Sequence, residues 1–130
     1  SELIEKIKLN NLKWGIVTNK PHVYATKIIE ETPDLSSCMT LVCPDHLKKA
    51  KPSPEGILLA CNQLNLNPKE VIYFGDHQKD LMASRAAGTL TAACTYGYAL
   101  KSSDLENDDI EVRNLLEFSK TNFKSLDEHA

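Results

Sequence analysis

Four runs of consecutive apolar residues, separated by segments with helical periodicity, constrain the fold of this chain more than any other feature. The runs are continuous rather than alternating, which predicts strands that are covered on both faces. Strands that alternate with helices along a chain pair in parallel and place their helices on the two faces of the sheet. The sequence therefore predicts a parallel three-layer α/β fold, with strands at residues 14–18, 39–43, 71–74 and 90–95.

Apolar residues spaced three or four positions apart predict helices at residues 2–12, 22–31, 54–64 and 79–87. Ser53 is expected to cap the third helix and Pro54 to be its first residue, where the missing N–H costs nothing. Gly88 is expected to end the fourth helix as a left-handed cap. In the second and third helices, the side chains expected to face inward are those of Val23, Ala25, Ile28, Ile29, Leu58, Cys61 and Leu64.

The carboxyl-terminal third carries a different pattern. Residues 102–109 are polar and acidic and predict a mobile loop. A short helix is expected to follow, with the apolar residues Val112, Leu115, Leu116 and Phe118. A length of 130 residues fits one domain, which we place at residues 1–120, followed by a frayed tail at 121–130.

Composition limits the classes of partner. The net charge is −3, so bulk electrostatics favours neither nucleic acid nor an anionic membrane. No apolar run approaches the roughly 20 residues that a membrane-spanning helix needs. The four cysteines show no C-x-x-C spacing, which predicts buried, reduced thiols in a cytoplasmic protein rather than disulfides or a zinc site.

Two carboxylates follow the third predicted strand. Asp76 comes directly after Gly75 in the turn, and Asp80 lies in the first turn of the next helix. The carboxyl ends of strands are where open α/β sheets bind ligands, and carboxylates without soft ligands nearby suit Mg²⁺. The helix dipole alone explains an acid at Asp80, but it does not explain Asp76. A transition-metal site with His77 has little support, because no second nitrogen or sulfur ligand lies at a usable spacing.

Polar residues also follow the first two predicted strands. Thr18 and Asn19 can bind phosphate oxygens beside the start of a helix, although a turn that caps this helix is the alternative. Lys51, held before a proline-rich helix start, can neutralise phosphate charge or hold an aspartate, although a solvated surface lysine is the alternative. Each motif is weak alone, but their common position at strand ends makes the combination specific.

With these motifs in this order, the chain resembles the haloacid dehalogenase-like phosphatases, and most closely their phosphoglycolate phosphatase branch. The resemblance covers roughly residues 3–118 and implies a three-layer Rossmann-like core with a mostly parallel sheet. The segments similar to the family's second, third and fourth motifs are Val17-Thr18-Asn19-Lys20-Pro21, Lys51-Pro52-Ser53-Pro54-Glu55 and Gly75-Asp76-His77-Gln78-Lys79-Asp80, the last continued by Ala86-Ala87-Gly88. Thr95-Tyr96-Gly97-Tyr98 is similar to the segment after the family's last core strand.

The resemblance implies a phosphatase of small phosphorylated metabolites that works through an aspartyl-phosphate. Thr18 and Asn19 would hold the phosphoryl group, and Lys51 would stabilise its charge; Thr18 and Lys51 are thus the implied catalytic residues. Asp76 would ligate Mg²⁺, and Asp80 would support the metal site and orient Lys51. Positioning and charge neutralisation dominate such chemistry.

The chain departs from the family at the first motif. No Asp-x-Asp segment occurs in this sequence, so the family's nucleophile and its general acid/base have no counterpart, and the helical cap that selects substrate is missing too. The chain resembles the carboxyl-terminal part of such an enzyme, beginning just after the cap, and is expected to be inactive alone. In this family the first strand lies mid-sheet, between the strands equivalent to 14–18 and 71–75. We expect these two strands either to pair directly or to receive a strand from another chain, for example by exchange in a homodimer.

Three other functional classes fit the sequence less well than the phosphatase does. The leading alternative is a non-catalytic phosphate-binding or regulatory module that retains a phosphate pocket. A phosphoaspartate receiver domain ranks last, because it needs an acidic pair after its first strand. A dinucleotide site is disfavoured because no G-x-G-x-x-G follows any predicted strand.

Overall fold

The computed structural model describes residues 2–97, 99–106 and 108–119. The predicted tail at 121–130 lies outside these residues, and so do Tyr98 and the side chain of Leu116. The strands are β1 Ile16–Val17, β2 Leu41–Val42, β3 Ile72–Gly75, β4 Leu90–Cys94 and β5 Ile110–Val112. The α-helices are α1 Glu2–Leu9, α2 His22–Glu31, α3 Glu55–Leu64, α4 Gln78–Ala87 and α5 Leu115–Ser119. Short 3₁₀ helices cover Pro33–Leu35, Pro44–His46, Pro68–Glu70 and Ser102–Asp104.

The strands form two parallel sheets rather than one. β1 pairs with β2, with Ile16 opposite Leu41, and β3, β4 and β5 pair in that order. Within the described part of the chain, no strand joins β1 to β3. Parallel pairing is confirmed. Of the two alternatives predicted for β1 and β3, direct pairing of these strands does not occur among the described residues. β1 and β3 therefore each keep one edge whose backbone groups make no sheet hydrogen bonds with another described strand.

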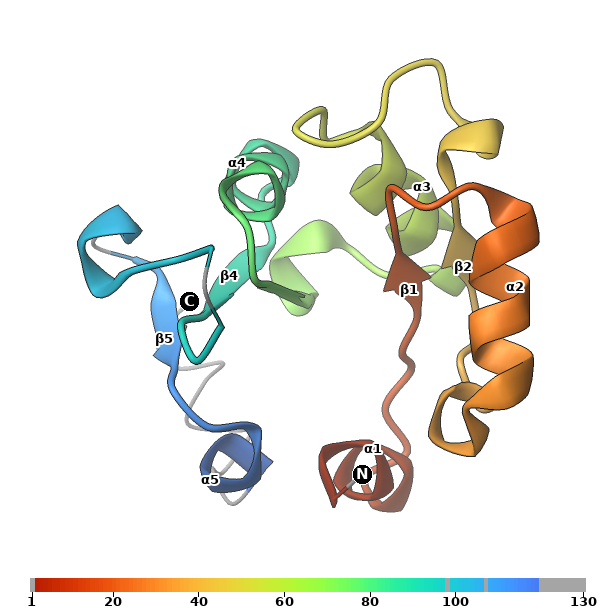
Figure 1. The fold of residues 1–130 in the computed structure, drawn as a ribbon, viewed down its shortest axis with the longest axis horizontal. Helices are drawn as coiled ribbons and strands as arrows, with labels where there is room; N and C mark the ends of the chain where they lie inside the picture. The colour runs from red at the N-terminus through yellow and green to blue at the C-terminus, as the bar shows by residue number, and fades with distance from the viewer. Residues whose placement is uncertain (1, 98, 107, 120–130) are drawn as a thin grey trace.

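Helices cover both faces of the sheets, which confirms the three-layer prediction (Figure 1). α3 contacts α4 on one side, and α1 contacts α5 on the other. β3 shows how the two faces are filled, because successive side chains of a strand point in opposite directions. Tyr73 packs against a buried cluster formed by α3 and α4, whose members are Ile57, Cys61, Ala83 and Ala87. Phe74 makes an edge-to-face contact with Phe118 of α5 at 5.1 Å between ring centroids.

The centre of the larger sheet is β4. Its residues from Thr91 to Cys94 are all buried, as expected for a strand with a neighbour on each edge and helices on each face. Where polar residues enter this core they bond to one another: the hydroxyl oxygen of Ser84 lies 2.7 Å from that of Thr89 and 2.6 Å from that of Thr91. These bonds satisfy groups whose burial would otherwise cost free energy.

Helix ends follow the sequence signals closely. Gly88 ends α4 with φ of 82°, and its N–H donates to the carbonyl oxygens of Ser84 and Arg85, so the predicted left-handed cap is confirmed. α3 begins at Glu55, one residue later than expected, so Pro54 and not Ser53 occupies the N-cap position. The Ser53 hydroxyl still accepts a hydrogen bond from the Glu55 N–H at 3.2 Å, so it satisfies one of the donors that a helix start leaves open.

Several burial predictions were wrong. Val23, Ile28 and Leu58 are exposed by 67%, 40% and 42%. In α2 only Ala25 is buried, and the sheet beside this helix in Figure 1 has just two short strands. The strands predicted at 14–18 and 39–43 pair over two residues each, and each has a single described neighbour.

The region after β4 also differs from the prediction. Val112 lies in strand β5 and not in a helix, because Ile110–Val112 pairs with β4. The segment predicted as a mobile loop contains the 3₁₀ helix Ser102–Asp104, and Arg85 of α4 forms ion pairs with Asp109 and Glu106 in it. A strand of three residues with a central glutamate has too little apolar pattern to be recognised, so its partner strand decides its structure.

No helix in the described ranges combines the length and the apolar character needed to cross a bilayer.

Candidate active site

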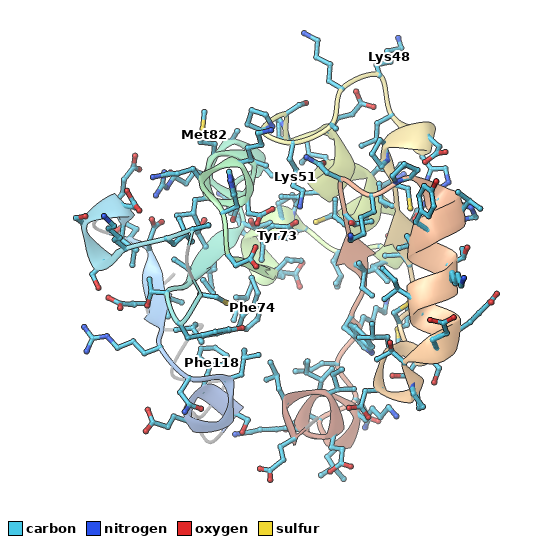
Figure 2. All side chains as sticks on the ribbon, viewed as in Figure 1. Lys48, Lys51, Tyr73, Phe74, Met82 and Phe118 are labelled. Carbon is cyan, nitrogen blue, oxygen red and sulfur yellow. The ribbon has the colours of Figure 1, made fainter. Side chains whose placement is uncertain are left out.

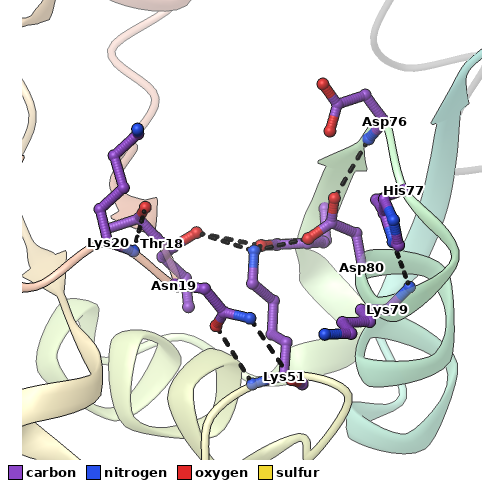
Figure 3. A network of polar contacts seen from close by, with 10 residues as sticks. Thr18, Asn19, Lys20, Lys51, Asp76, His77, Lys79 and Asp80 are labelled. Atoms are coloured by element: carbon purple, nitrogen blue, oxygen red, sulfur yellow. Dashed lines mark hydrogen bonds and ion pairs between the residues drawn. The ribbon is translucent and has the colours of Figure 1, made fainter. Parts of the chain in front are cut away.

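Lys51 is at the centre of a polar network between the two sheets (Figures 2 and 3). Its ammonium group donates to Asp80 Oδ1 at 2.5 Å, to the Tyr73 hydroxyl at 3.0 Å and to the Val17 carbonyl oxygen at 3.3 Å. The side chains of Lys51 and Asp80 are each only 11% exposed. The alternative of a solvated surface lysine is therefore wrong. This lysine extends from the loop before α3 to the carboxyl end of β1 and the first turn of α4.

The electrostatics of the network keep Lys51 charged. Burial is the largest influence and by itself lowers the pKa of Lys51, but Tyr73 and Asp80 together outweigh it and raise this pKa above its ordinary value. Burial raises the pKa of Tyr73, with the Lys51 charge opposing. The phenol therefore stays neutral and donates its proton to the Val17 carbonyl oxygen at 3.2 Å while it accepts from Lys51.

Both oxygens of Asp80 are engaged. One accepts from Lys51, and the other accepts from the backbone N–H of Asp76 at 3.2 Å. Asp80 lies in the first turn of α4, which His77 caps by accepting the Lys79 N–H on its Nδ1 at 3.3 Å. Asp80 thus joins Lys51 to the turn between β3 and α4. The Asp76 side chain of this turn points away from Lys51 (Figure 3).

Gly75 leaves the space that Asp80 occupies. A Cβ atom built on Gly75 would lie 2.2 Å from the Cβ of Asp80, closer than two carbon atoms can approach. This contact explains why a glycine ends β3. The reason is the packing of Asp80 rather than an unusual backbone conformation.

Replacing Gly75 with alanine is expected to lower the free energy of unfolding by about 1–3 kcal/mol, because Asp80 must move away from a packed position. Urea unfolding of this chain, followed by circular dichroism, measures the effect. The matched control is Gly97→Ala, where an added Cβ meets no atom within 4 Å. Equal stability of the two variants would contradict the packing argument.

Thr18 and Asn19 lie at the end of β1, beside Lys51. The Thr18 hydroxyl oxygen accepts the Lys20 N–H at 3.1 Å, so the turn considered as the alternative does form. The Asn19 amide bonds to the backbone of Lys51. The structure therefore brings all five predicted site residues together (Figure 3), namely Thr18, Asn19, Lys51, Asp76 and Asp80. Their roles toward a ligand stay predictions.

The donor atoms fit Mg²⁺ through a single protein ligand. The Asp76 side chain is exposed, whereas the Asp80 oxygens are already occupied. Among the described residues, no three His, Cys, Asp or Glu side chains are grouped to hold a metal ion. Mg²⁺ keeps several waters and is commonly bound by one or two carboxylates plus substrate phosphates, so the exposed Asp76 carboxylate has suitable chemistry, whereas both Asp80 oxygens already accept hydrogen bonds.

An open cavity of about 270 Å³ lies at this position. It is lined by Asn19, Lys51, His77, Lys79 and Asp80. A larger cavity, of about 630 Å³, lies at the opposite end of β4 around Arg85 and Thr89. Because ligands of open α/β folds bind at the carboxyl ends of the strands, the smaller cavity is the candidate site.

Tyr73 is the site residue that sequence reasoning missed. The sequence pattern predicts only that Tyr73 lies in a strand, but its hydroxyl joins Lys51 to β1. A phenol in an otherwise apolar strand is the available signal, because a buried tyrosine hydroxyl needs a partner.

The chain is similar to known proteins of one family. The family model of haloacid dehalogenase-like hydrolases matches residues 1–94. The chain is 42% identical over 122 residues to an N-acetylmuramic acid 6-phosphate phosphatase of Pseudomonas putida, a match that covers 92% of this chain and 55% of that protein. It is 32% identical over 102 residues to a phosphoglycolate phosphatase of Xanthomonas campestris, over 78% of this chain and 46% of that protein.

Solved structures show the same relationship. A haloacid dehalogenase-superfamily hydrolase of Ehrlichia chaffeensis superposes with a TM-score of 0.78 at 26% identity, over 96% of this chain and 56% of that one. A hydrolase of Pseudomonas syringae superposes with a TM-score of 0.77 at 25% identity, over 98% and 57%. The chain spans about half the length of the curated relatives it matches. On its motifs, its fold and the match over residues 1–94, the chain belongs to the haloacid dehalogenase-like hydrolase family.

Proposed function

We propose that this chain supplies the phosphate- and metal-binding half of a magnesium-dependent phosphatase that hydrolyses small phosphorylated metabolites. The observation that carries the proposal is the buried Lys51–Asp80 ion pair beside the exposed carboxylate of Asp76, close to the carboxyl ends of β1 and β3. A fixed cation next to a hard oxygen ligand suits a phosphate monoester with its metal ion. Both curated relatives described above are named as phosphatases, which supports the same reaction.

Each residue has a proposed role. Lys51 balances the charge of the transferring phosphoryl group, and Thr18 and Asn19 help to hold this group from the end of β1. Asp76 holds Mg²⁺, and Asp80 supports the metal site and fixes Lys51. When bound, Mg²⁺ supplies further neutralisation of the phosphoryl oxygens.

The nucleophile must come from another segment, since the sequence contains no Asp-x-Asp pair. By the family resemblance, an aspartate attacks phosphorus, the bond from phosphorus to the substrate's ester oxygen breaks, and the alcohol leaves with a proton. Water then hydrolyses the aspartyl-phosphate to aspartate and phosphate. This chain alone therefore has no turnover.

The unpaired edges of β1 and β3 are the proposed place for a further strand. The two strands have no sheet partner on these edges among the described residues, and such edges favour association. In preparations of this chain by itself, a partner copy is the available donor, so we propose strand exchange in a homodimer. Sedimentation of this chain as a compact monomer would contradict it. A cytoplasmic location is supported by the four cysteines, all of which are free thiols.

The activity is tested with this chain and with a complete protein, meaning one in which the family's Asp-x-Asp segment and cap precede these residues, using p-nitrophenyl phosphate, phosphoglycolate and N-acetylmuramic acid 6-phosphate. We expect hydrolysis by the complete protein with Mg²⁺, a loss of hydrolysis with EDTA, and no hydrolysis by this chain. Phosphate binding by the complete protein without turnover of any of the three esters would favour the non-catalytic module. Turnover by the purified chain would overturn the proposed need for a separate nucleophile.

A further inference from the structure

The Asn19 side chain pairs with the peptide groups of Lys51. Its Nδ2 donates to the Lys51 carbonyl oxygen at 3.4 Å, and its Oδ1 accepts the Lys51 N–H at 3.3 Å. A side-chain amide thus bonds both backbone groups of one residue that lies 32 positions away in the chain. In Figure 3 the Asn19 amide lies beside the lysine side chain, and two dashed lines join it to the Lys51 backbone.

Lys51 is consequently held to β1 at both of its ends. Its ammonium group donates to the carbonyl oxygen of Val17, and its backbone bonds to Asn19, two residues further along. The start of the same loop is held differently, because Glu55 accepts the N–H groups of Lys48 and Lys49 at 2.9 Å and 3.3 Å. Among these contacts, the Asn19 pair is the one that ties the backbone of Lys51 to the strand end.

The occupied atoms limit what Asn19 can do for a ligand. Its Oδ1 and one of its amide hydrogens are already used, so the amide cannot turn toward a phosphate without releasing Lys51. A long, flexible lysine side chain contributes most to a transition state when its backbone is fixed, because small displacements reduce the stabilisation of developing charge.

We infer that Asn19 is a positioning residue that acts through the backbone of Lys51, rather than a direct phosphate ligand. The expected effect of Asn19 on catalysis rests on the proposed function, whereas its expected effect on the Lys51 backbone does not. It changes the role of Asn19 from holding the phosphoryl group to placing the lysine that does so.

The test uses the complete protein with Asn19→Ala, and with Asn62→Ala as the matched control, because Asn62 is an exposed asparagine of α3 outside the site. Amide hydrogen exchange is measured by NMR at Lys51. Loss of one hydrogen bond is expected to speed exchange of the Lys51 N–H about five- to tenfold, and the control is expected to leave it unchanged. In Asn19→Asp the carboxylate still accepts this N–H, so protection of Lys51 should return.

Kinetics with p-nitrophenyl phosphate supply the second readout. Asn19→Ala is expected to lower kcat about tenfold and to change KM by less than about twofold, since a displaced lysine weakens the transition state more than the bound substrate. Unchanged exchange at Lys51 in Asn19→Ala would overturn the inference, and so would faster exchange with an unchanged kcat. If Asn19→Ala does not fold, faster exchange at Lys51 in Asn19→Asp than in the control would equally overturn it. If the unmodified protein hydrolyses no ester, the proposed function fails, while the exchange data still test the contact itself.

Discussion

Replacing Lys51 with methionine in the complete protein is expected to lower kcat for phosphate ester hydrolysis by about 10²–10³-fold. The ammonium group is the one buried cation of the described site, and it lies between the carboxyl end of β1 and the first turn of α4. Methionine has a similar length and no charge, so it removes the charge with little change in volume. Steady-state kinetics with p-nitrophenyl phosphate measure the effect.

The same variant tests the folding role of the ion pair. Removing one partner of a buried pair leaves the other charge uncompensated, so the free energy of unfolding should fall by about 3–5 kcal/mol. Lys49→Met is the control, because Lys49 is an exposed lysine of the same loop. If the methionine variant is too unstable, Lys51→Arg keeps a charge but not the shape of the ammonium group, and it should fold and still lose activity. A folded Lys51→Met protein with undiminished kcat would refute the role of this lysine.

Replacing Asp76 with asparagine is expected to abolish the response to Mg²⁺ and to lower kcat by about 10²–10³-fold, because a metal ion contributes several kcal/mol of charge stabilisation. The carboxylate is exposed, and its backbone N–H, which bonds to Asp80, is retained in the variant. The free energy of unfolding should therefore change by less than about 0.5 kcal/mol.

Loss of activity with retained stability distinguishes the expected role of Asp76 from those of Asp80 and Lys51, which also stabilise the fold through their ion pair. Magnesium titration of kcat and thermal unfolding, performed on the same preparation, provide the two measurements. Asp108→Asn is the control, since Asp108 is an exposed aspartate beside the larger cavity at the other end of β4. An Asp76→Asn protein that keeps the Mg²⁺ response of the control would show that the metal binds elsewhere.

Sequence reasoning succeeded where local physics decides the outcome. The strand at 71–74, the helix at 79–87 and the cap at Gly88 agree with the structure within one residue, because apolar runs, periodicity and a glycine at positive φ are local signals. It failed for β5 and for the exposed face of α2. Whether Ile110–Val112 forms a strand depends on β4, and whether Val23 is buried depends on what covers α2.

The sequence by itself determined the class of the fold, the order of the polar motifs and their common position at strand ends, since residue type and spacing encode these properties. Only the tertiary structure decided how the motifs touch. Lys51 reaches Asp80, Tyr73 and Val17 across 22 to 34 positions of the chain, and Asn19 bonds the backbone of Lys51 across 32. Such contacts depend on how the two sheets and their loops pack, and no local pattern records which partner a buried ammonium or a side-chain amide will meet.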